Sequence, residues 1–298
     1  MQNNPLADNS SVRPIKIGSG TRSLSGRIAT PTQGEPRGLI VALHGGSYTS
    51  QYFDSPGHSI MGAIARLGYT IIALDRPGYG DAREWPLNFD AQVEVLARAI
   101  AKLWQDHKAG SPGVFLYGHS IGGMIALLIG GAKRDFPLVG LSMTGAGAVV
   151  REQALLAFTG ASQAPTSHVD LPYEGKMALM FGPKWAFDAT IAAADPNRDV
   201  PLATVELRDA LNWEQRLPSA AKVVDVPVQF IVGEYDGIWH ADKLDDAKGF
   251  FLKAPFADVY QQRQSGHDVE LEHLGFAQAL KVVAFAEECR LRSSKIET

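Results

Sequence analysis

Residues 114–124, Val-Phe-Leu-Tyr-Gly-His-Ser-Ile-Gly-Gly-Met, decide the fold of this chain. The stretch begins as an apolar run typical of a buried strand, turns at residues 118–122, and continues as an apolar helix pattern over 121–132. A serine flanked by glycines two positions away on each side, between a strand and a helix, is the pattern of a nucleophile elbow. Its strained turn projects the hydroxyl of Ser120 and directs the side chain of His119 away from it. The pattern therefore predicts Ser120 as a nucleophile, with a helix N-terminus beside it that favours negative charge.

The alternation of strand and helix extends to both sides of this stretch. Short apolar runs, typical of strands covered on both faces of a parallel sheet, lie at 38–43, 69–74, 113–117, 138–143 and 227–232, with a further strand-like segment at 257–261. Helical patterns lie at 59–67, 89–107, 121–132 and 269–291, and residues 12–17 and 22–30 are expected to pair as a hairpin. This order predicts an α/β fold with a mostly parallel sheet flanked by helices.

The alternation stops between residues 147 and 221. This segment shows no clear strand and holds amphipathic stretches broken by prolines. We interpret it as a helical insertion that covers the sheet, and we call it the cap. Residues 1–146 and 222–298 then form the core.

The composition narrows the expected partners. A net charge of −4 gives no electrostatic reason to expect nucleic acid or an anionic membrane. The single cysteine, Cys289, cannot form an internal disulfide, and residues 1–10 lack the apolar core of a signal peptide. The apolar runs are far shorter than the roughly 20 residues of a membrane span, and dinucleotide, phosphate and zinc motifs are absent. We expect a cytoplasmic protein with no membrane span, no nucleic-acid partner, no cofactor and no metal; the oligomeric state stays open.

A second glycine turn, at residues 44–47, follows the strand at 38–43. Nucleophilic attack on a carbonyl group needs two aligned N–H donors for the developing oxyanion. Ile121, directly after the nucleophile, is expected to supply one of these donors. Gly46 is expected to supply the other, with Ser47 as the alternative. We expect His44 to be structural, with its ring hydrogen-bonded within the loop.

The acid and the base of a catalytic triad should follow in the order Ser, Asp or Glu, His. Asp236 and His267 each follow a predicted strand in a turn that contains glycine. Because the carboxyl ends of parallel strands meet at one edge of a sheet, we expect both side chains at the edge that carries Ser120. Glu234 is the rival acid, and Asp268 is expected to cap the final helix.

Taken together, these motifs resemble the α/β-hydrolase superfamily. They are His44-Gly45-Gly46, Asp75-Arg-Pro-Gly-Tyr-Gly80, Gly118-His-Ser-Ile-Gly122-Gly123, Gly233-Glu-Tyr-Asp236 and Gly266-His267. The resemblance covers roughly residues 36–146 and 222–290, and it implies an eight-stranded, mostly parallel sheet in which 75–80 is a structural loop. Members with an aspartate nucleophile, the haloalkane dehalogenases and epoxide hydrolases, differ because position 120 is serine here. The cap matches no particular family.

These residues predict a serine hydrolase that cleaves a carboxylic ester, thioester or lactone through an acyl-enzyme. We expect a small substrate with an apolar acyl group. The cap is expected to select the substrate while the sheet carries the bond-breaking groups. Aromatic residues expected to line the pocket are Tyr48, Phe158, Trp185, Trp213 and Trp239. Two alternatives stay open: the same triad can cleave carbon–carbon bonds or act as a lyase in a biosynthetic pathway, and a hydrolase fold can serve ligand binding with little turnover.

Overall fold

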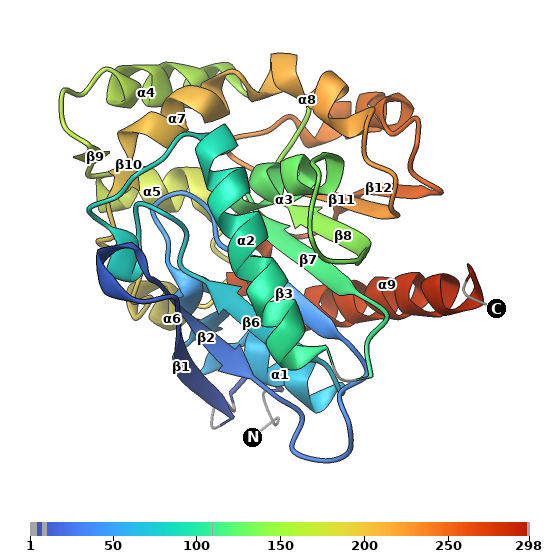
Figure 1. The fold of residues 1–298 in the computed structure, drawn as a ribbon. Helices are drawn as coiled ribbons and strands as arrows, with labels where there is room; N and C mark the ends of the chain where they lie inside the picture. The colour runs from blue at the N-terminus through green and yellow to red at the C-terminus, as the bar shows by residue number, and fades with distance from the viewer. Residues whose placement is uncertain (1–4, 8–10, 109, 297–298) are drawn as a thin grey trace.

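An eight-stranded sheet forms the centre of the computed structural model, which describes residues 5–7, 11–108 and 110–296 (Figure 1). In spatial order the strands are β1 (Val12–Ile17), β2 (Leu24–Ala29), β6 (Thr70–Leu74), β3 (Leu39–Leu43), β7 (Val114–His119), β8 (Leu138–Thr144), β11 (Val228–Gly233) and β12 (Ala257–Gln262). β2 is antiparallel to both of its neighbours, and all other pairs are parallel. The predicted fold class is therefore confirmed. Most of residues 1–10, on which the expectation about a signal peptide rests, lie outside the described residues.

The central strands are buried along their whole length. β3, β6, β7, β8 and β11 have no exposed residue, whereas most positions of the edge strands β1 and β12 are exposed or half-buried. A strand covered on both faces has to be apolar at successive positions, which is why the continuous apolar runs marked these strands in the sequence.

Helices flank the sheet in two groups. α1 (Ile60–Arg66) packs against α9 (Gly275–Ile296), and α2 (Phe89–His107) packs against α3 (Ile121–Gly131). Side-chain caps fix where α1 and α2 begin: Ser59 Oγ accepts from Gly62 N at 2.9 Å, and Asn88 Oδ1 accepts from Ala91 N at 3.0 Å. In the described part of the chain, no helix is long and apolar enough to cross a membrane.

Between β8 and β11 the chain leaves the sheet and is mostly helical. The elements there are α4 (Glu152–Ser162), β9 (His168–Val169), α5 (Tyr173–Met180), α6 (Ala189–Ala193), β10 (Leu202–Ala203), α7 (Thr204–Leu211) and α8 (Trp213–Ala221). The two-residue strands β9 and β10 pair with each other, a small sheet that the sequence did not predict. α4 packs against α7 at the top of Figure 1, whereas α8 packs against α3 of the core. The other short elements are β4 (Asp54–Ser55), β5 (His58–Ser59) and the 3-10 turns η1 (Gly20–Arg22), η2 (Ser50–Phe53), η3 (Gly80–Ala82), η4 (Ala241–Phe250) and η5 (Val269–Leu271).

The final helix begins later than predicted. The sequence pattern placed its start at 269, but the chain makes the 3-10 turn η5 there, and α9 starts only at Gly275. The reason is that Glu270 and Glu272 are both fully buried. Glu270 accepts from the hydroxyls of Tyr52, Tyr117 and Thr144, and Glu272 accepts from backbone N–H groups of neighbouring loops. A segment that directs its acidic side chains into the core cannot also present an apolar helix face.

Candidate active site

Ser120 lies at a sharp turn between β7 and α3. Its backbone has φ 52° and ψ −122°, a conformation that costs a residue with a side chain free energy. The flanking glycines leave no room for a side chain: a Cβ atom at Gly118 would lie 2.4 Å from Gly122 O, and one at Gly122 would lie 2.1 Å from Leu43 O. These close approaches explain why the turn needs glycine at both positions.

His267 and Asp236 meet beyond the carboxyl ends of β12 and β11. His267 Nδ1 lies 2.9 Å from Asp236 Oδ2, and both side chains are buried. The other carboxylate oxygen accepts from Ile238 N at 2.8 Å and from Trp239 N at 2.9 Å. Because a carboxylate only accepts hydrogen bonds, Nδ1 carries a proton, and in the neutral ring Nε2 carries the free lone pair. The structure thus pairs His267 with Asp236, and we call these two residues the dyad. The rival Glu234 instead accepts from Gln264 N at 2.8 Å.

The surroundings favour the charged form of His267. Burial alone lowers the pKa of the imidazole, but the Asp236 carboxylate raises it, and Asp268 and Glu270 add to this effect, so the pKa lies above its usual value. His267 Nε2 is buried and has no hydrogen-bond partner among the described residues, Ser120 Oγ included. If Ser120 and His267 act together, a hydrogen bond between these two atoms would form as a substrate binds, because catalytic hydrogen bonds are often long or unmade in ligand-free sites.

The backbone N–H groups of Gly46 and Ile121 have no hydrogen-bond partner among the described residues, and both residues line the same pocket as Ser120. Ile121 is the first residue of α3, where an N–H group has no acceptor within the helix. A Cβ atom at Gly46 would lie 2.9 Å from Ile121 Cδ1, so the two residues are neighbours. The alternative donor, Ser47, already donates to the Tyr79 hydroxyl at 3.2 Å. The geometry favours Gly46 over Ser47.

His44 stabilises this turn, as the sequence indicated. Its Nδ1 lies 2.7 Å from Gly45 O, and its Nε2 accepts from Arg76 N at 3.1 Å. These two contacts require the proton on Nδ1. A neutral ring used on both sides in this way fixes the loop and is not free to act as a base.

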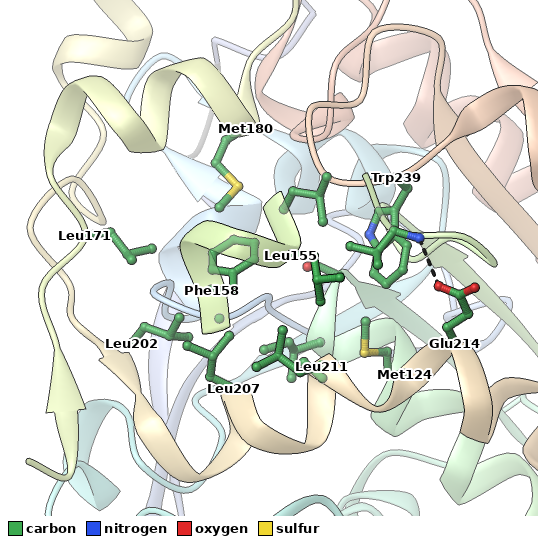
Figure 2. A pocket seen from close by; sticks show the side chains of 16 residues that line it. Met124, Leu155, Phe158, Leu171, Met180, Leu202, Leu207, Leu211, Glu214 and Trp239 are labelled. Carbon is green, nitrogen blue, oxygen red and sulfur yellow. Dashed lines mark hydrogen bonds between the residues drawn. The ribbon is translucent and has the colours of Figure 1, made fainter. Parts of the chain in front are cut away.

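Ser120 borders an apolar pocket (Figure 2). The cap supplies most of the lining, namely Val150, Leu155, Phe158, Leu171, Met180, Leu202, Leu207, Ala210, Leu211 and Glu214. The core supplies Gly46, Ser120, Ile121, Met124, Ile238 and Trp239. Figure 2 shows Leu171 at one end of the hollow and Glu214 with Trp239 at the other. Glu214 is the one ionisable group of the lining, so the pocket suits an uncharged apolar group.

Three of the five aromatic residues predicted for the pocket lie elsewhere. Tyr48 is buried beside the dyad, and its hydroxyl donates to Asp268 Oδ2 at 2.5 Å. Trp213 is fully buried and belongs to the hydrophobic core. Trp185 is 54 % exposed and contacts the ring of Tyr235 edge-on. The other two predicted residues, Phe158 and Trp239, do line the pocket.

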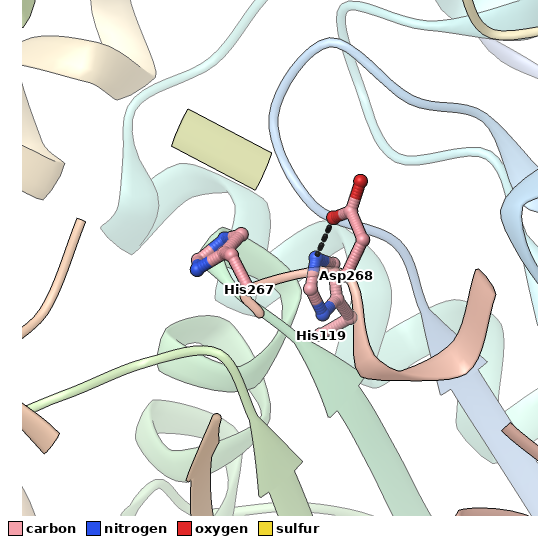
Figure 3. Close-up of side chains that lie close together, drawn as sticks. All are labelled: His119, His267 and Asp268. Atoms are coloured by element: carbon pink, nitrogen blue, oxygen red, sulfur yellow. Dashed lines mark ion pairs between the residues drawn. The ribbon is translucent and has the colours of Figure 1, made fainter. Parts of the chain in front are cut away.

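A buried group of ionisable side chains lies next to the dyad (Figure 3). His119 Nε2 is 3.1 Å from Asp268 Oδ1, in ion-pair contact but without hydrogen-bond geometry, and His119 Nδ1 is 3.4 Å from Glu270 Oε2. Asp268 therefore contacts His119 and Tyr48, and its side chain caps no helix, contrary to the prediction. The two carboxylates hold the His119 ring, whose edge contacts the ring of His267 at a centroid distance of 5.0 Å.

The same group is where a metal ion would find ligands. Among the described residues, His119, His267 and Asp268 offer ligand atoms that lie within 4.8 Å of one another. Ligand atoms about 2.1 Å from a tetrahedral zinc ion lie roughly 3.4 Å apart, so this spread exceeds what a zinc site allows. We interpret the group as a buried polar cluster that packs against the His267 ring.

Sequence reasoning missed two buried contacts between charged side chains of the cap and the core, an ion pair and a hydrogen bond from an ammonium group. Glu206 of α7 accepts from Arg76 Nη1 at 2.5 Å, and both side chains are fully buried. Lys176 of α5 donates to Ser47 O at 3.0 Å. Arg76 lies in the 75–80 loop that was interpreted as structural. Nothing in the sequence distinguishes Glu206 and Lys176 from the ordinary surface charges of amphipathic helices.

Known proteins share this architecture. The model of the alpha/beta hydrolase family matches residues 40–279. A soluble variant of the monoglyceride lipase from Saccharomyces cerevisiae is 16 % identical with a TM-score of 0.76, over 95 % of this chain and 97 % of that one. A highly thermostable carboxyl esterase from Bacillus coagulans is 16 % identical with a TM-score of 0.71, over 94 % and 99 % of the two chains. A monoacylglycerol lipase from Paleococcus ferrophilus is 17 % identical with a TM-score of 0.65, over 93 % and 99 %.

No curated protein matches the chain significantly. At these identities the solved structures show the likeness of the fold alone. The family model, by contrast, spans the strands from β3 onward, the elbow, the cap and the dyad. The chain belongs to the alpha/beta hydrolase family.

Proposed function

We propose that this protein is a serine hydrolase that cleaves a carboxylic ester, thioester or lactone with an apolar acyl group. One observation carries the proposal: Ser120, held in a strained turn, borders an apolar pocket at the point where two unpaired N–H groups are neighbours and a buried His–Asp pair lies on the same sheet edge. Each of these features has a defined role in acyl transfer, and an ordinary glycine turn needs none of them.

In the proposed mechanism, His267 Nε2 takes the proton of Ser120 as Oγ attacks the carbonyl carbon. Asp236 keeps the proton of the neutral ring on Nδ1 and stabilises the imidazolium that forms. The N–H groups of Gly46 and Ile121 bind the oxyanion. His267 then protonates the leaving alkoxide or thiolate, and the acyl group stays on Ser120. Water, deprotonated by His267, releases the acid by the reverse steps.

The pocket supports an apolar acyl group as the bound part of the substrate. Apart from Ser120 and Glu214, its lining side chains are aliphatic, aromatic or thioether groups. Such a surface gains free energy from burying hydrocarbon and offers few partners for polar substituents. Proteins of similar structure include a monoglyceride lipase and a carboxyl esterase, which agrees with an ester as substrate. An ester or thioester is also easier to cleave than an amide, because its leaving group is easier to expel.

The test combines labelling with turnover. A fluorophosphonate should add once, at Ser120, and Ser120→Ala should abolish the labelling. p-Nitrophenyl esters of increasing acyl length should be hydrolysed, and Ser120→Ala should lower activity by about 10⁴ to 10⁶. Labelling at another serine of the wild-type protein would refute the assignment. Labelling of Ser120 without turnover of any ester or thioester would favour carbon–carbon bond cleavage, lyase activity or ligand binding instead.

A further inference from the structure

The turn at residues 44–48, which contains the proposed donor Gly46, has a conformation that its own sequence does not favour. Ser47 has φ 58°, in the left-handed region, and is fully buried. A residue with a side chain keeps such a conformation only where its surroundings fix it. The contacts made to this turn therefore decide where the Gly46 N–H group points.

Two core side chains hold the turn from one side. Arg76 donates from Nε to His44 O at 2.8 Å and from Nη2 to Gly45 O at 3.0 Å. The Tyr79 hydroxyl accepts from Ser47 N at 3.2 Å. These bonds fix the peptide groups immediately before and after Gly46.

Glu206, from helix α7 of the cap, is the common partner of both side chains. Its carboxylate accepts from Arg76 Nη1 at 2.5 Å and Nη2 at 3.2 Å, from the Tyr79 hydroxyl, and from Gln92 Nε2 at 3.0 Å. Among the described residues it is the one carboxylate paired with Arg76, and neither side chain is exposed. Burial alone lowers the pKa of Arg76, but Glu206 raises it above the usual value, so the guanidinium is charged and depends on Glu206 as its counter-ion.

We propose that Glu206 is a positioning residue for the oxyanion donor at Gly46, acting through Arg76 and Tyr79. The inference rests on the proposed function, because it gives the Gly46 N–H group its role. It assigns the cap a part in bond-breaking besides substrate selection. A neutral amide at 206 would fill the same volume but would leave the guanidinium without its charge partner. It would also place an N–H donor where two donors now converge. Arg76 and Tyr79 would then shift, and the turn with them.

Three variants separate this role from simple support of the fold. Glu206→Gln removes the charge and keeps the size. Tyr79→Phe removes only the hydroxyl between Glu206 and Ser47. Asp209→Asn is the matched control, since Asp209 lies on the same helix and also ties cap to core, accepting from Phe89 N at 2.6 Å, but does not contact the turn.

The first readout, amide hydrogen exchange of the peptide that covers residues 44–49, is independent of activity. In Glu206→Gln and Tyr79→Phe these amides should exchange roughly tenfold faster, the factor expected when one buried hydrogen bond is lost from a local structure. In Asp209→Asn their exchange should match the wild type.

The second readout is the division of the effect between kcat and KM. Loss of one oxyanion donor lowers kcat by about 10² to 10³ in well-studied hydrolases, so Glu206→Gln should lower kcat of p-nitrophenyl ester hydrolysis by about 10². KM should change less than about threefold, because pocket contacts such as those of Phe158 remain. The kcat of Tyr79→Phe should lie between those of the wild type and Glu206→Gln, and Asp209→Asn should keep the wild-type kcat.

The inference is overturned if folded Glu206→Gln keeps wild-type kcat and wild-type exchange at 44–49, or if Asp209→Asn reproduces its effects. If Glu206→Gln does not fold, Tyr79→Phe decides in its place, and wild-type values for that variant overturn the inference. Failure of the proposed function gives a different result: a wild-type protein that fluorophosphonates do not label at Ser120. Faster exchange at 44–49 in Glu206→Gln would still show that Glu206 positions the turn in that case.

Discussion

Asp236→Asn should disable this enzyme while leaving its fold intact. The Oδ1 atom of Asp236 accepts from two backbone N–H groups, Ile238 at 2.8 Å and Trp239 at 2.9 Å, and an asparagine can satisfy both with its carbonyl oxygen. Its NH2 group must then face His267 Nδ1, which is 2.9 Å from Oδ2 in the wild type. A donor facing Nδ1 drives the ring proton to Nε2, and the lone pair that should accept the proton of Ser120 is lost.

The size of the effect follows from this change of tautomer. In a serine protease the same substitution lowers kcat by about 10⁴ with the geometry preserved. Since the acid here is equally buried and bonds to the same imidazole nitrogen, we expect kcat/KM to fall by about 10⁴. That factor corresponds to about 5.4 kcal/mol of activation free energy at about 1.36 kcal/mol for each factor of ten.

The assay is hydrolysis of a short p-nitrophenyl ester, together with the second-order rate of fluorophosphonate addition to Ser120. Both reactions need Ser120 deprotonated, so both should slow down. Glu234→Gln is the control: its Oε2 accepts only from Gln264 N at 2.8 Å, which an amide oxygen can replace, so its kcat/KM should stay within about threefold of wild type. The reasoning is refuted if Asp236→Asn retains a tenth of the wild-type rate, or if Glu234→Gln loses as much.

Three further changes test the base, the pocket and the elbow. First, kcat/KM should fall as the pH drops, because protonated His267 cannot accept a proton. Since the pKa of His267 is raised, the midpoint of this fall should lie above pH 6.5. A midpoint below that pH would contradict the pairing with Asp236. Second, Phe158→Ala should lower kcat/KM for long acyl esters by tenfold or more, because it removes about 1 to 3 kcal/mol of contact with the substrate. Trp185→Ala, at a residue 54 % exposed, should change kcat/KM less than about twofold. Equal effects of the two variants in an acyl-length series would place the acyl group elsewhere. Third, Gly122→Ala should lower the free energy of unfolding, measured in urea, by about 3 kcal/mol or more, because the new Cβ would lie 2.1 Å from Leu43 O. A stable, active variant would show that the turn can relax.

The sheet could be predicted from the sequence because its signal is local. A buried parallel strand such as β3 has to be apolar at every position, and the elbow requires glycine at 118 and 122. The order of the triad candidates follows from chain topology, since Asp236 and His267 each directly follow a strand. These features depend on neighbours along the chain or on one sheet edge, so a single sequence contains them.

The predictions that were wrong or missing concern contacts between segments that lie far apart in the sequence. Trp213 and Trp185 have the same side chain, and only packing decides that one is fully buried and the other exposed. The apolar spacing after His267 is helical, yet Glu270 draws the chain inward because three hydroxyls of the core point at it. Glu206 is one acidic residue of a polar helix until the fold places Arg76 beside it. The local sequence pattern does not contain the information about which distant residue each of these side chains contacts.

The buried pair of Arg76 and Glu206 also limits how far the cap can move. Swinging α7 away would separate two side chains that are fully buried, at a cost of about 3 to 5 kcal/mol for a broken buried pair. The open state would then be populated below roughly 1 %. We therefore expect substrates to enter where Leu155 and Glu214, both exposed, reach the pocket lining, by movement of side chains.

We therefore expect that the cap needs no lipid surface to admit a substrate. Hydrolysis of a micelle-forming ester should follow the concentration of dissolved monomer and show no jump at the critical micelle concentration. A sharp rise in the wild-type rate at that concentration would mean that the cap opens despite the pair. The separation of Arg76 from Glu206 would then cost far less than their complete burial implies.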